Sequence, residues 1–489
     1  MKHPVLTALG AGAAALVLAV GANTYFGHDK PPAVEPAPRL DIDLGAAAGK
    51  LTGALRAVTI SDPGDKDANV AEFNKLQAHI DASFPRVGSE LKKERVGTGH
   101  ALLYTWQGTD PALPAVMWMA HQDVVPVAPG TEKNWRHPPF AGVVAEGFIW
   151  GRGAWDDKGN MFAQLEAIEA LIASGFRPMR TIYLAYGADE EVGGKRGAAA
   201  IATLLGKRGV KLDYVIDEGL LILQGIVPGL PKAAATVGVA EKGYATFRLE
   251  VSAPPGHSSM PPGRTVIGML GKALGQLEEH QMPLHSDGLA QQMFETLAPE
   301  MGGFDRVALS NFWLFRPILE RKLEKSPSIN AMLRTTSAPT LISAGVKENV
   351  LPGYASAMVN FRLLPGDTIA DAQRHIESTI QNDAIRVSLN SDFSSEASSV
   401  VPADSIRLAT LNRTIREVFP AVVVAPGLMI GGTDSRYMHA LTSEVFKFTP
   451  MHANHEDLAR FHGTNERISL EAYGDMIRFY YRLAQNTAR

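Results

Sequence analysis

Short apolar stretches that end in acidic or histidine residues constrain this chain most strongly. Residues 115–120 run directly into His121-Gln122-Asp123, and residues 181–186 lead into Asp189-Glu190-Glu191. Each stretch has the length of a buried strand, and apolar positions at helical spacing lie between them, over 160–176. Alternating strands and helices predict an α/β fold with a mostly parallel sheet. Binding sites in such sheets lie at the carboxyl ends of the strands, where these polar residues fall.

The pattern of elements also predicts a division into domains. A chain of 489 residues is too long for one hydrophobic core. Residues 241–395 contain the order strand-helix-strand-strand-helix-strand, interrupted by a helical stretch over about 279–337, which predicts an inserted ferredoxin-like (split βαβ) lid domain with a helical insertion. Residues 50–240 and 396–489 are then expected to form a single catalytic domain, split by this insertion, which could also serve dimerisation.

The N-terminus is expected to lie outside the catalytic fold. Residues 1–22 contain Lys2 followed by an uncharged, mostly apolar run, which predicts a signal peptide or a membrane anchor. Residues 23–49 are expected to form a linker, because proline and alanine alternate over 31–38. The sequence therefore predicts an exported protein, either periplasmic or extracellular or anchored by a single pass. Contact with a membrane is expected only through this segment.

Charge and cysteine usage exclude some classes of function. The formal net charge is -4, and the basic residues are scattered, so nucleic acid is not an expected partner. The chain has no cysteine, so any metal must be held by histidine, aspartate or glutamate side chains.

Several side chains suit such a metal site, although each is weak evidence alone. Asp156 lies in a glycine-bracketed turn, where its carboxylate could approach two metal ions, but it could equally be a solvated turn acid. Glu190 and Glu191 could divide their work between base and ligand, or form an ordinary surface pair. Asp217, which follows a short apolar strand, and His462, near the C-terminus, are unconvincing alone.

Taken together, three ordered segments carry a family resemblance. They are Ala-His-Gln-Asp-Val-Val-Pro-Val at 120–127, Trp-Gly-Arg-Gly-Ala-Trp-Asp-Asp-Lys-Gly at 150–159 and Asp-Glu-Glu-Val-Gly-Gly at 189–194. They resemble the aminoacylase/carboxypeptidase family of di-zinc metallopeptidases, above all its carboxypeptidase S and N-fatty-acyl-amino-acid hydrolase/synthase branch. The resemblance extends over nearly all of the chain from about residue 50.

The resemblance implies a role for each residue of the metal site. His121, Asp156 and Asp217 would bind one Zn²⁺, and Asp156, Glu191 and His462 the other, with cobalt or manganese as possible substitutes. Glu190 would be the general base, and Asp123 would orient His121. A cis peptide bond is expected between Asp156 and Asp157.

In the inserted domain and the loop beside it, the resemblance implies contacts with the substrate. His257, in Pro-Gly-His-Ser-Ser, would stabilise the oxyanion of the transition state. Asn349 and Arg362 would bind a substrate carboxylate, for which an arginine fork is well suited. Gly432 and Thr433 would line the same pocket.

The expected activity is hydrolysis of an amide bond next to a free carboxylate. The substrate would be a small peptide, for a carboxypeptidase, or an N-acyl amino acid, for an N-(fatty-)acyl-amino-acid hydrolase/synthase. The apolar segment at 312–315 slightly favours a hydrophobic acyl group, although it could simply pack within the insertion. A homodimer is possible. The alternative is a non-catalytic, membrane-tethered binding protein on a peptidase fold.

Overall fold

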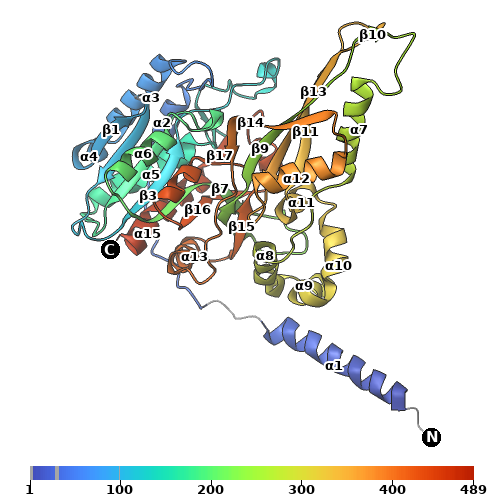
Figure 1. Cartoon of the computed structure of the whole chain (residues 1–489). Coiled ribbons are helices and arrows are strands. Elements are labelled where there is room, and N and C mark those ends of the chain that lie inside the picture. The colour runs from blue at the N-terminus through green and yellow to red at the C-terminus, as the bar shows by residue number, and fades with distance from the viewer. Residues whose placement is uncertain (1–3, 28–31, 99, 489) are drawn as a thin grey trace.

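The structure, a computed structural model, describes residues 4–27, 32–98 and 100–488. A mixed eight-stranded sheet with the order β1-β2-β6-β3-β7-β16-β8-β15 forms the centre of the larger domain (Figure 1). The pairs β3–β6, β3–β7, β7–β16 and β8–β15 are parallel, so the expected mostly parallel sheet is confirmed. The strands span Lys92–Val96 (β1), Ala101–Trp106 (β2), Ala115–His121 (β3), Ile182–Gly187 (β6), Leu212–Leu223 (β7), Ala234–Glu241 (β8), Val423–Met429 (β15) and Val445–Ala453 (β16).

Helices cover both faces of this sheet, which explains why β3 is apolar at almost every position. Val116 and Trp118 belong to the core cluster shared with α2, α5 and α15. Met117 and Met119 point to the opposite face, where α6 packs. The helices of this domain span Leu44–Leu55 (α2), Val70–Ser83 (α3), Pro85–Glu90 (α4), Lys158–Ala173 (α5), Ala198–Lys207 (α6), Ile406–Val418 (α13), His455–Leu458 (α14) and Leu470–Thr487 (α15). A small sheet, β17-β5-β4, joins Arg467–Ser469, Phe148–Trp150 and Val143–Ala145.

The inserted segment has its own antiparallel sheet, with the order β11-β13-β9-β14. Along the chain the elements follow as β9-α7-β11-β13-α12-β14, the order expected from the sequence. Their bounds are Gly243–Ser252 (β9), Val266–Glu279 (α7), Thr336–Ala344 (β11), Tyr354–Leu363 (β13), Ile369–Ile380 (α12) and Ile385–Ser395 (β14). The two-residue strands Gly256–His257 (β10) and Val350–Leu351 (β12) pair at the far end of this domain (Figure 1).

Four helices between α7 and β11 form the helical insertion. They span Leu289–Leu297 (α8), Gly303–Ser310 (α9), Phe312–Leu323 (α10) and Pro327–Leu333 (α11). Their buried side chains share an apolar cluster with Ala234 of β8 and Ala425 of β15. The insertion therefore packs against the β15 edge of the main sheet.

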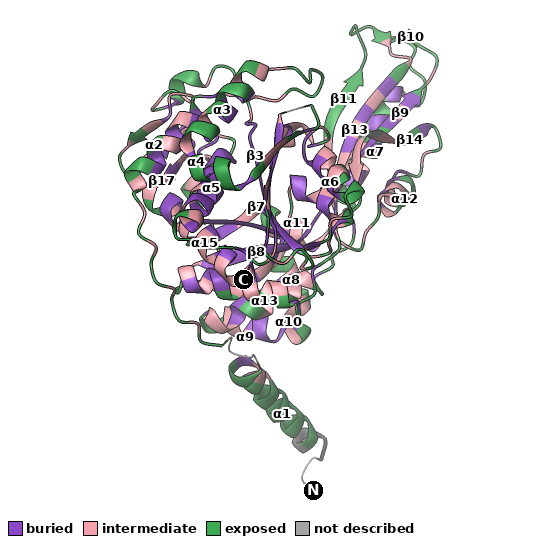
Figure 2. Cartoon of the chain, turned by 90° about the vertical axis from the view of Figure 1, so that its left-hand side faces the viewer, coloured by how far each residue is buried: buried purple, intermediate pink, exposed green. Residues whose placement is uncertain are grey.

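The N-terminal helix α1, Pro4–Phe26, projects away from the rest of the molecule (Figures 1 and 2). Within it, Ala8–Phe26 is long and apolar enough to cross a membrane. The segment expected to be a linker, 23–49, is shorter in the structure, because α1 continues to Phe26 and α2 begins at Leu44. It also contacts the folded domain, since Ala37 donates a backbone hydrogen bond to Glu417. Residues 1–3 of the expected leader lie outside the described residues.

Candidate metal centre

Two histidines from distant parts of the chain contact the same carboxylate. His121, at the end of β3, places Nε2 2.9 Å from Oδ1 of Asp156. His462, just after α14, places Nε2 2.7 Å from Oδ2 of the same side chain. Asp156 lies in the turn before α5, where Gly151 and Gly153 adopt positive φ angles of 155° and 87°. These conformations favour glycine and give this turn its shape.

Two further carboxylates complete two groups of potential ligands. Glu218 joins His121 and Asp156, and Glu191 joins Asp156 and His462; within each group the ligand atoms lie within 4.8 Å of one another. Oε1 of Glu218 is 3.5 Å from His121 Nε2, and Oε1 of Glu191 is 3.6 Å from His462 Nε2. Asp156 belongs to both groups. The arrangement suits two cations that share one carboxylate, with the nitrogen and oxygen ligands that zinc accepts.

Glu218, rather than Asp217, lies beside His121 and Asp156, which differs from the expectation. The sequence predicted a strand that ends at Asp217, but β7 continues to Leu223 beside β16. The pairing of β7 with β16 is irregular between Asp217 and Leu220, and at this irregularity the Glu218 carboxylate joins the group of His121 and Asp156. The Asp217 carboxylate instead accepts hydrogen bonds from the backbone N–H groups of Ser435, at 2.8 Å, and Glu218, at 3.0 Å.

Asp123 ties the loop that carries the two glutamates to the end of β3. Its carboxylate accepts hydrogen bonds from the backbone N–H groups of Glu190 and Glu191, at 3.2 and 3.1 Å, and from the Ser61 hydroxyl at 2.7 Å. Its Oδ1 lies 3.4 Å from His121 Nδ1, and its backbone oxygen lies 3.0 Å from the same nitrogen. These contacts place Asp123 where it can orient the imidazole.

A buried ion pair that the sequence analysis did not single out holds the turn of Asp156. Glu466 Oε1 accepts hydrogen bonds from the backbone N–H groups of Gly153, Trp155 and Asp156. Its other oxygen lies 2.6 Å from Arg152 Nη1. Arg152 also donates to the backbone oxygen of His462 at 3.1 Å. Glu466 thereby joins the two segments that carry Asp156 and His462, and its position four residues after His462 was the only sequence signal.

The acidic residues of the centre have strongly shifted pKa values. Burial raises the pKa of Glu190 to about 8 and that of Glu191 to about 9, and it raises the pKa of Glu218 well above its usual range. Burial acts on Asp156 in the same direction, but hydrogen bonds from His121 and His462 outweigh it and lower the pKa of Asp156. So many buried carboxylates in one place are what a bound cation would stabilise in the charged form. The residues present therefore fit a metal.

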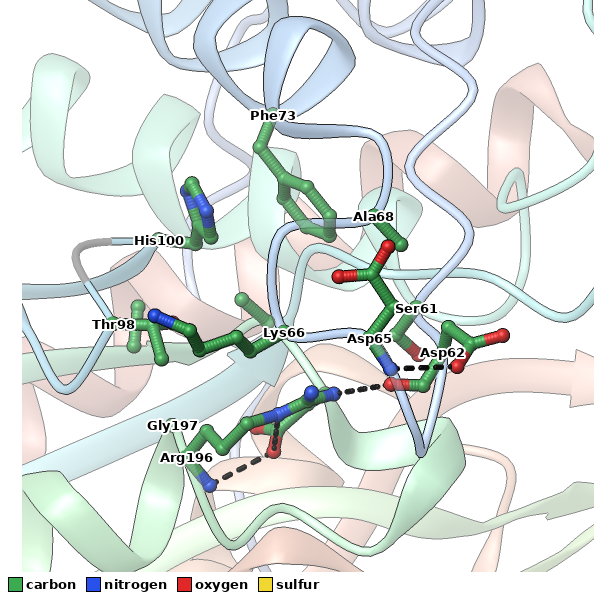
Figure 3. Close-up of a pocket in the computed structure, with 13 residues that line it drawn as sticks. Ser61, Asp62, Asp65, Lys66, Ala68, Phe73, Thr98, His100, Arg196 and Gly197 are labelled. Atoms are coloured by element: carbon green, nitrogen blue, oxygen red, sulfur yellow. Dashed lines mark hydrogen bonds and ion pairs between the residues drawn. The ribbon is translucent and has the colours of Figure 1, made fainter.

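A second set of contacts holds Asp189, the residue that precedes Glu190 and Glu191. Arg196 donates from its backbone and its guanidinium to Asp189, at 2.8 and 3.3 Å, and to the backbone oxygen of Asp62 at 2.7 Å (Figure 3). The cavity that these residues line with Ser61 and His100 has a volume of only about 10 Å³, on the scale of a single water molecule. It is therefore part of the support of the loop and is too small for a substrate.

His257 and Asn349 of the inserted domain do not reach the metal centre within this chain. Both are exposed, and His257 lies on β10, at the end of the inserted domain remote from β3 and β7 (Figure 1). Its ring Nδ1 is 2.8 Å from the hydroxyl oxygen of Ser259. Backbone hydrogen bonding joins this turn to Asn349, since Ser258 N–H donates to Asn349 at 3.2 Å. The two residues therefore lie together but apart from Asp156.

Arg362, in contrast, is connected to Glu190 through a series of ring contacts. Its guanidinium lies 4.7 Å from the ring centre of Tyr244, which meets the Phe393 ring at 4.9 Å. The guanidinium of Arg436 lies 5.2 Å from the Phe393 ring, and its Nη2 is 3.4 Å from Oε1 of Glu190. The sequence analysis gave Arg436 no role.

Gly432 and Thr433 lie in the loop that leads to Arg436. Thr433 is buried and donates from Oγ1 to Oε2 of Glu241 at 3.1 Å. A Cβ atom at Gly432 would come within 2.9 Å of Nη1 of Arg436, so a larger residue there would displace this guanidinium. The loop thus positions Arg436 beside Glu190.

Fold, shared carboxylate and paired ligand groups define a metallopeptidase of the Peptidase family M20/M25/M40, whose model matches residues 117–486. The chain belongs to this family. It is therefore an enzyme of the metallopeptidase and amidohydrolase class, which hydrolyses amide bonds and depends on a metal.

Two relatives with long alignments show which members of the family this chain is similar to. The chain is 41% identical over 440 residues to the N-fatty-acyl-amino acid synthase/hydrolase PM20D1 of Xenopus tropicalis, covering 89% of this chain and 85% of that protein. It is 37% identical over 451 residues to the probable carboxypeptidase S-like 2 of Dictyostelium discoideum, covering 92% and 86%. The family resemblance drawn from the sequence is thereby confirmed, and nothing in these relatives supports the non-catalytic alternative.

Solved structures share the fold at low sequence identity. The metallo-carboxypeptidase Sso-CP2 of Sulfolobus solfataricus superposes with a TM-score of 0.65 at 18% identity, covering 90% of this chain and 98% of that one. Human carnosine dipeptidase 1 gives a TM-score of 0.60 at 17% identity, covering 91% and 98%.

The cis peptide bond expected between Asp156 and Asp157 is present in this chain.

Proposed function

We propose that this enzyme uses two zinc ions to hydrolyse an amide bond next to a free carboxylate. The observation that carries the proposal is Asp156, whose two oxygens face two separate groups of ligands. His121 and Glu218 would hold one ion with Asp156, and Glu191 and His462 would hold the other. This set replaces Asp217 of the sequence-based expectation by Glu218. When bound, the ions supply an activated water and polarise the carbonyl group.

Glu190 is the proposed general base. It lies next to Glu191 but belongs to neither ligand group, so its carboxylate is free to take the proton of the attacking water and pass it to the leaving nitrogen. Arg436, 3.4 Å from its Oε1, holds it in place. Asp123 orients His121 and fixes the backbone of Glu190, so that ligand and base keep their spacing.

N-acyl amino acids are the substrate class that we favour. An apolar cavity of about 420 Å³ lies between the helical insertion and the main sheet, with Leu289, Met293, Leu364 and Leu428 in its lining. Leu364 follows Arg362 by two residues, so an acyl group in this cavity would lie close to the residue proposed to bind the carboxylate. The relatives named as N-fatty-acyl-amino acid synthase/hydrolases support this choice.

A small peptide is the second candidate substrate, because relatives named as carboxypeptidases are almost as similar. Both substrates present a free carboxylate beside the amide, which Arg362 could bind. Because hydrolysis is reversible, the same centre could also condense a fatty acid with an amino acid when the acyl component is abundant.

His257 and Asn349 reach the centre in this proposal by domain closure or from a second copy of the chain. A homodimer is supported by the edge strand β11, whose Leu341 and Ile342 are 67% and 65% exposed. Export is supported by α1, which we propose serves as a signal peptide or a single-pass anchor and places the enzyme in the periplasm or outside the cell.

The test is release of free amino acid from N-oleoyl-phenylalanine and from an N-capped Gly-Leu dipeptide. Wild type and Glu190→Gln would be compared after metal loading, with Glu278→Gln, an exposed residue of α7, as the matched control. Cleavage of the lipid amide by wild type and the control, but about 10³-fold more slowly by Glu190→Gln, is the expected result. Cleavage of the dipeptide alone would favour the carboxypeptidase. Cleavage of neither substrate with both metals bound would overturn the proposal.

A further inference from the structure

We infer that the helical insertion rests on the lipid bilayer that α1 enters. The surface concerned consists of Phe304, Trp313 and Ile318 of α9 and α10, called here the insertion face. The enzyme is then held to the membrane at two places, by a helix that crosses it and by an apolar face that lies in its surface. This inference concerns the mature, uncleaved chain and does not depend on which amide the enzyme hydrolyses.

The end of α1 is fixed to the insertion by specific polar contacts. Asn311 donates from Nδ2 to Oγ1 of Thr24 at 2.9 Å, and Nδ2 of Asn23 donates to Oδ1 of Asn311 at 3.2 Å. The guanidinium of Arg306 lies 4.9 Å from the centre of the Tyr25 ring. Thr24 is 2% exposed. A helix that served only as a leader would not need such specific contacts with the folded domain.

The insertion face exposes large apolar side chains close to these contacts with α1. Phe304, Trp313 and Ile318 are 61%, 61% and 60% exposed, and Phe304 meets the Phe315 ring edge-on at 5.5 Å. The opposite side of these helices already packs against other apolar residues, because Phe312 is buried in the core of the insertion. A helix that is apolar on both sides needs a second apolar environment, and a group of such residues marks an interaction surface.

The length and direction of α1 identify a bilayer as that environment. Its apolar part, Ala8–Phe26, has 19 residues, and such a helix extends over ~28 Å, close to the ~30 Å of a hydrocarbon core. The helix leaves the molecule directly beneath α9 and α10 in both views (Figures 1 and 2). One surface of the bilayer therefore falls at the level of the insertion.

The residues at this level have the composition of a membrane interface. Tyr25 and Phe26 at the end of α1 are 63% and 86% exposed, beside the aromatic residues of the insertion face. Aromatic side chains are enriched at the boundary between lipid and water. Arg321 and Lys325, further along the chain from Trp313, are exposed and could meet anionic head groups.

The absence of cysteine allows a direct test with single labels in the full chain. Phe304→Cys and Trp313→Cys would each carry a nitroxide, in protein reconstituted into vesicles of phosphatidylcholine and phosphatidylglycerol. Val144→Cys on β4 of the catalytic domain, 48% exposed and remote from α1, is the matched control, and Leu16→Cys reports insertion of α1. Collision with oxygen, which enters lipid, is compared with collision with a water-soluble nickel chelate.

The expected result is that the labels at 304, 313 and 16 collide preferentially with oxygen, and the label at 144 with nickel. Labels at 304 and 313 that behave like the label at 144, while the label at 16 lies in lipid, would overturn the inference, because α1 would then cross the bilayer without the insertion touching it. A label at 16 that stays in water would overturn it as well. All four positions are exposed, so the substitutions themselves disturb no core.

Discussion

The candidate site residues of the catalytic domain already lie close together, whereas those of the inserted domain lie far from them. In the catalytic domain, His121, Asp156 and Glu218 already lie within 4.8 Å of one another, and Glu466 holds the turn of Asp156 by three backbone hydrogen bonds. In the inserted domain, His257 is exposed on a two-residue strand far from them (Figure 1).

In the proposed mechanism, this difference means that the residues for metal binding are assembled separately from those for transition-state binding. Buried carboxylates need fixed partners, because an unpaired charge in the interior is costly. An oxyanion donor has no such need in the resting enzyme, and it can arrive by a movement of the domain or from a second copy. Variants of the two regions should therefore fail in different ways.

The largest effect is expected for Glu218→Ala, which removes a ligand from the assembled region. We expect bound zinc to fall from two equivalents towards one and kcat/KM to fall by roughly 10³ or more, because a catalytic metal is worth several kcal/mol. Metal analysis together with amide hydrolysis is the measurement. Asp217→Ala is the informative partner: the Asp217 carboxylate accepts backbone hydrogen bonds from Ser435 and Glu218, and we expect its loss to cost about 10- to 100-fold in activity. The reverse order of the two variants would restore Asp217 as the ligand.

The next largest effect is expected for His257→Ala in the inserted domain. We expect kcat to fall about 10²- to 10³-fold, the usual cost of losing one oxyanion donor, with metal content and unfolding temperature unchanged. His280→Ala, also exposed in this domain, is the control. If His257 comes from a second copy, mixing His257→Ala with Glu190→Gln chains restores activity. Loss of metal in His257→Ala would contradict the separation of the two regions.

A smaller loss of activity, accompanied by loss of stability, is expected for Glu466→Gln. The change leaves Arg152 buried without its counter-charge, which should lower the free energy of unfolding by about 3–5 kcal/mol. Metal affinity should weaken about 10- to 100-fold, because the turn of Asp156 loosens. Denaturant unfolding and zinc titration measure the two effects. Glu456→Gln, whose side chain is 79% exposed in its pair with Arg460, should change neither.

The smallest effect is expected for Arg362→Lys. The charge remains but the bidentate fork is lost, so we expect KM to rise about tenfold for a substrate with a free carboxylate, with little change in kcat. The same variant should not alter hydrolysis of the corresponding carboxamide substrate. Arg386→Lys, on strand β14 of the same sheet, which β9 separates from β13, is the control. An equal rise of KM for both substrates would remove Arg362 from carboxylate recognition.

Much of the fold could be predicted because the signals were local. The apolar runs at 115–120 and 181–186 depend on side chains that are near one another in the sequence, and their bounds lie within one residue of those of β3 and β6. The strand β7 was predicted too short, because Asp217 and Glu218 interrupt its apolar pattern while its pairing with β16 continues beyond them.

The sequence by itself determined the family and the alternation of strands and helices, and its resemblance to that family predicted four residues that the structure brings together in the two ligand groups: His121, Asp156, Glu191 and His462. Only the tertiary structure placed Glu218, rather than Asp217, beside His121 and Asp156, because the pairing of β7 with β16 is irregular at this point. Only the tertiary structure also showed that Glu466 holds the turn of Asp156 and that the end of α1 contacts the helical insertion. These contacts join segments that are about 300 residues apart, and no local pattern encodes such pairings.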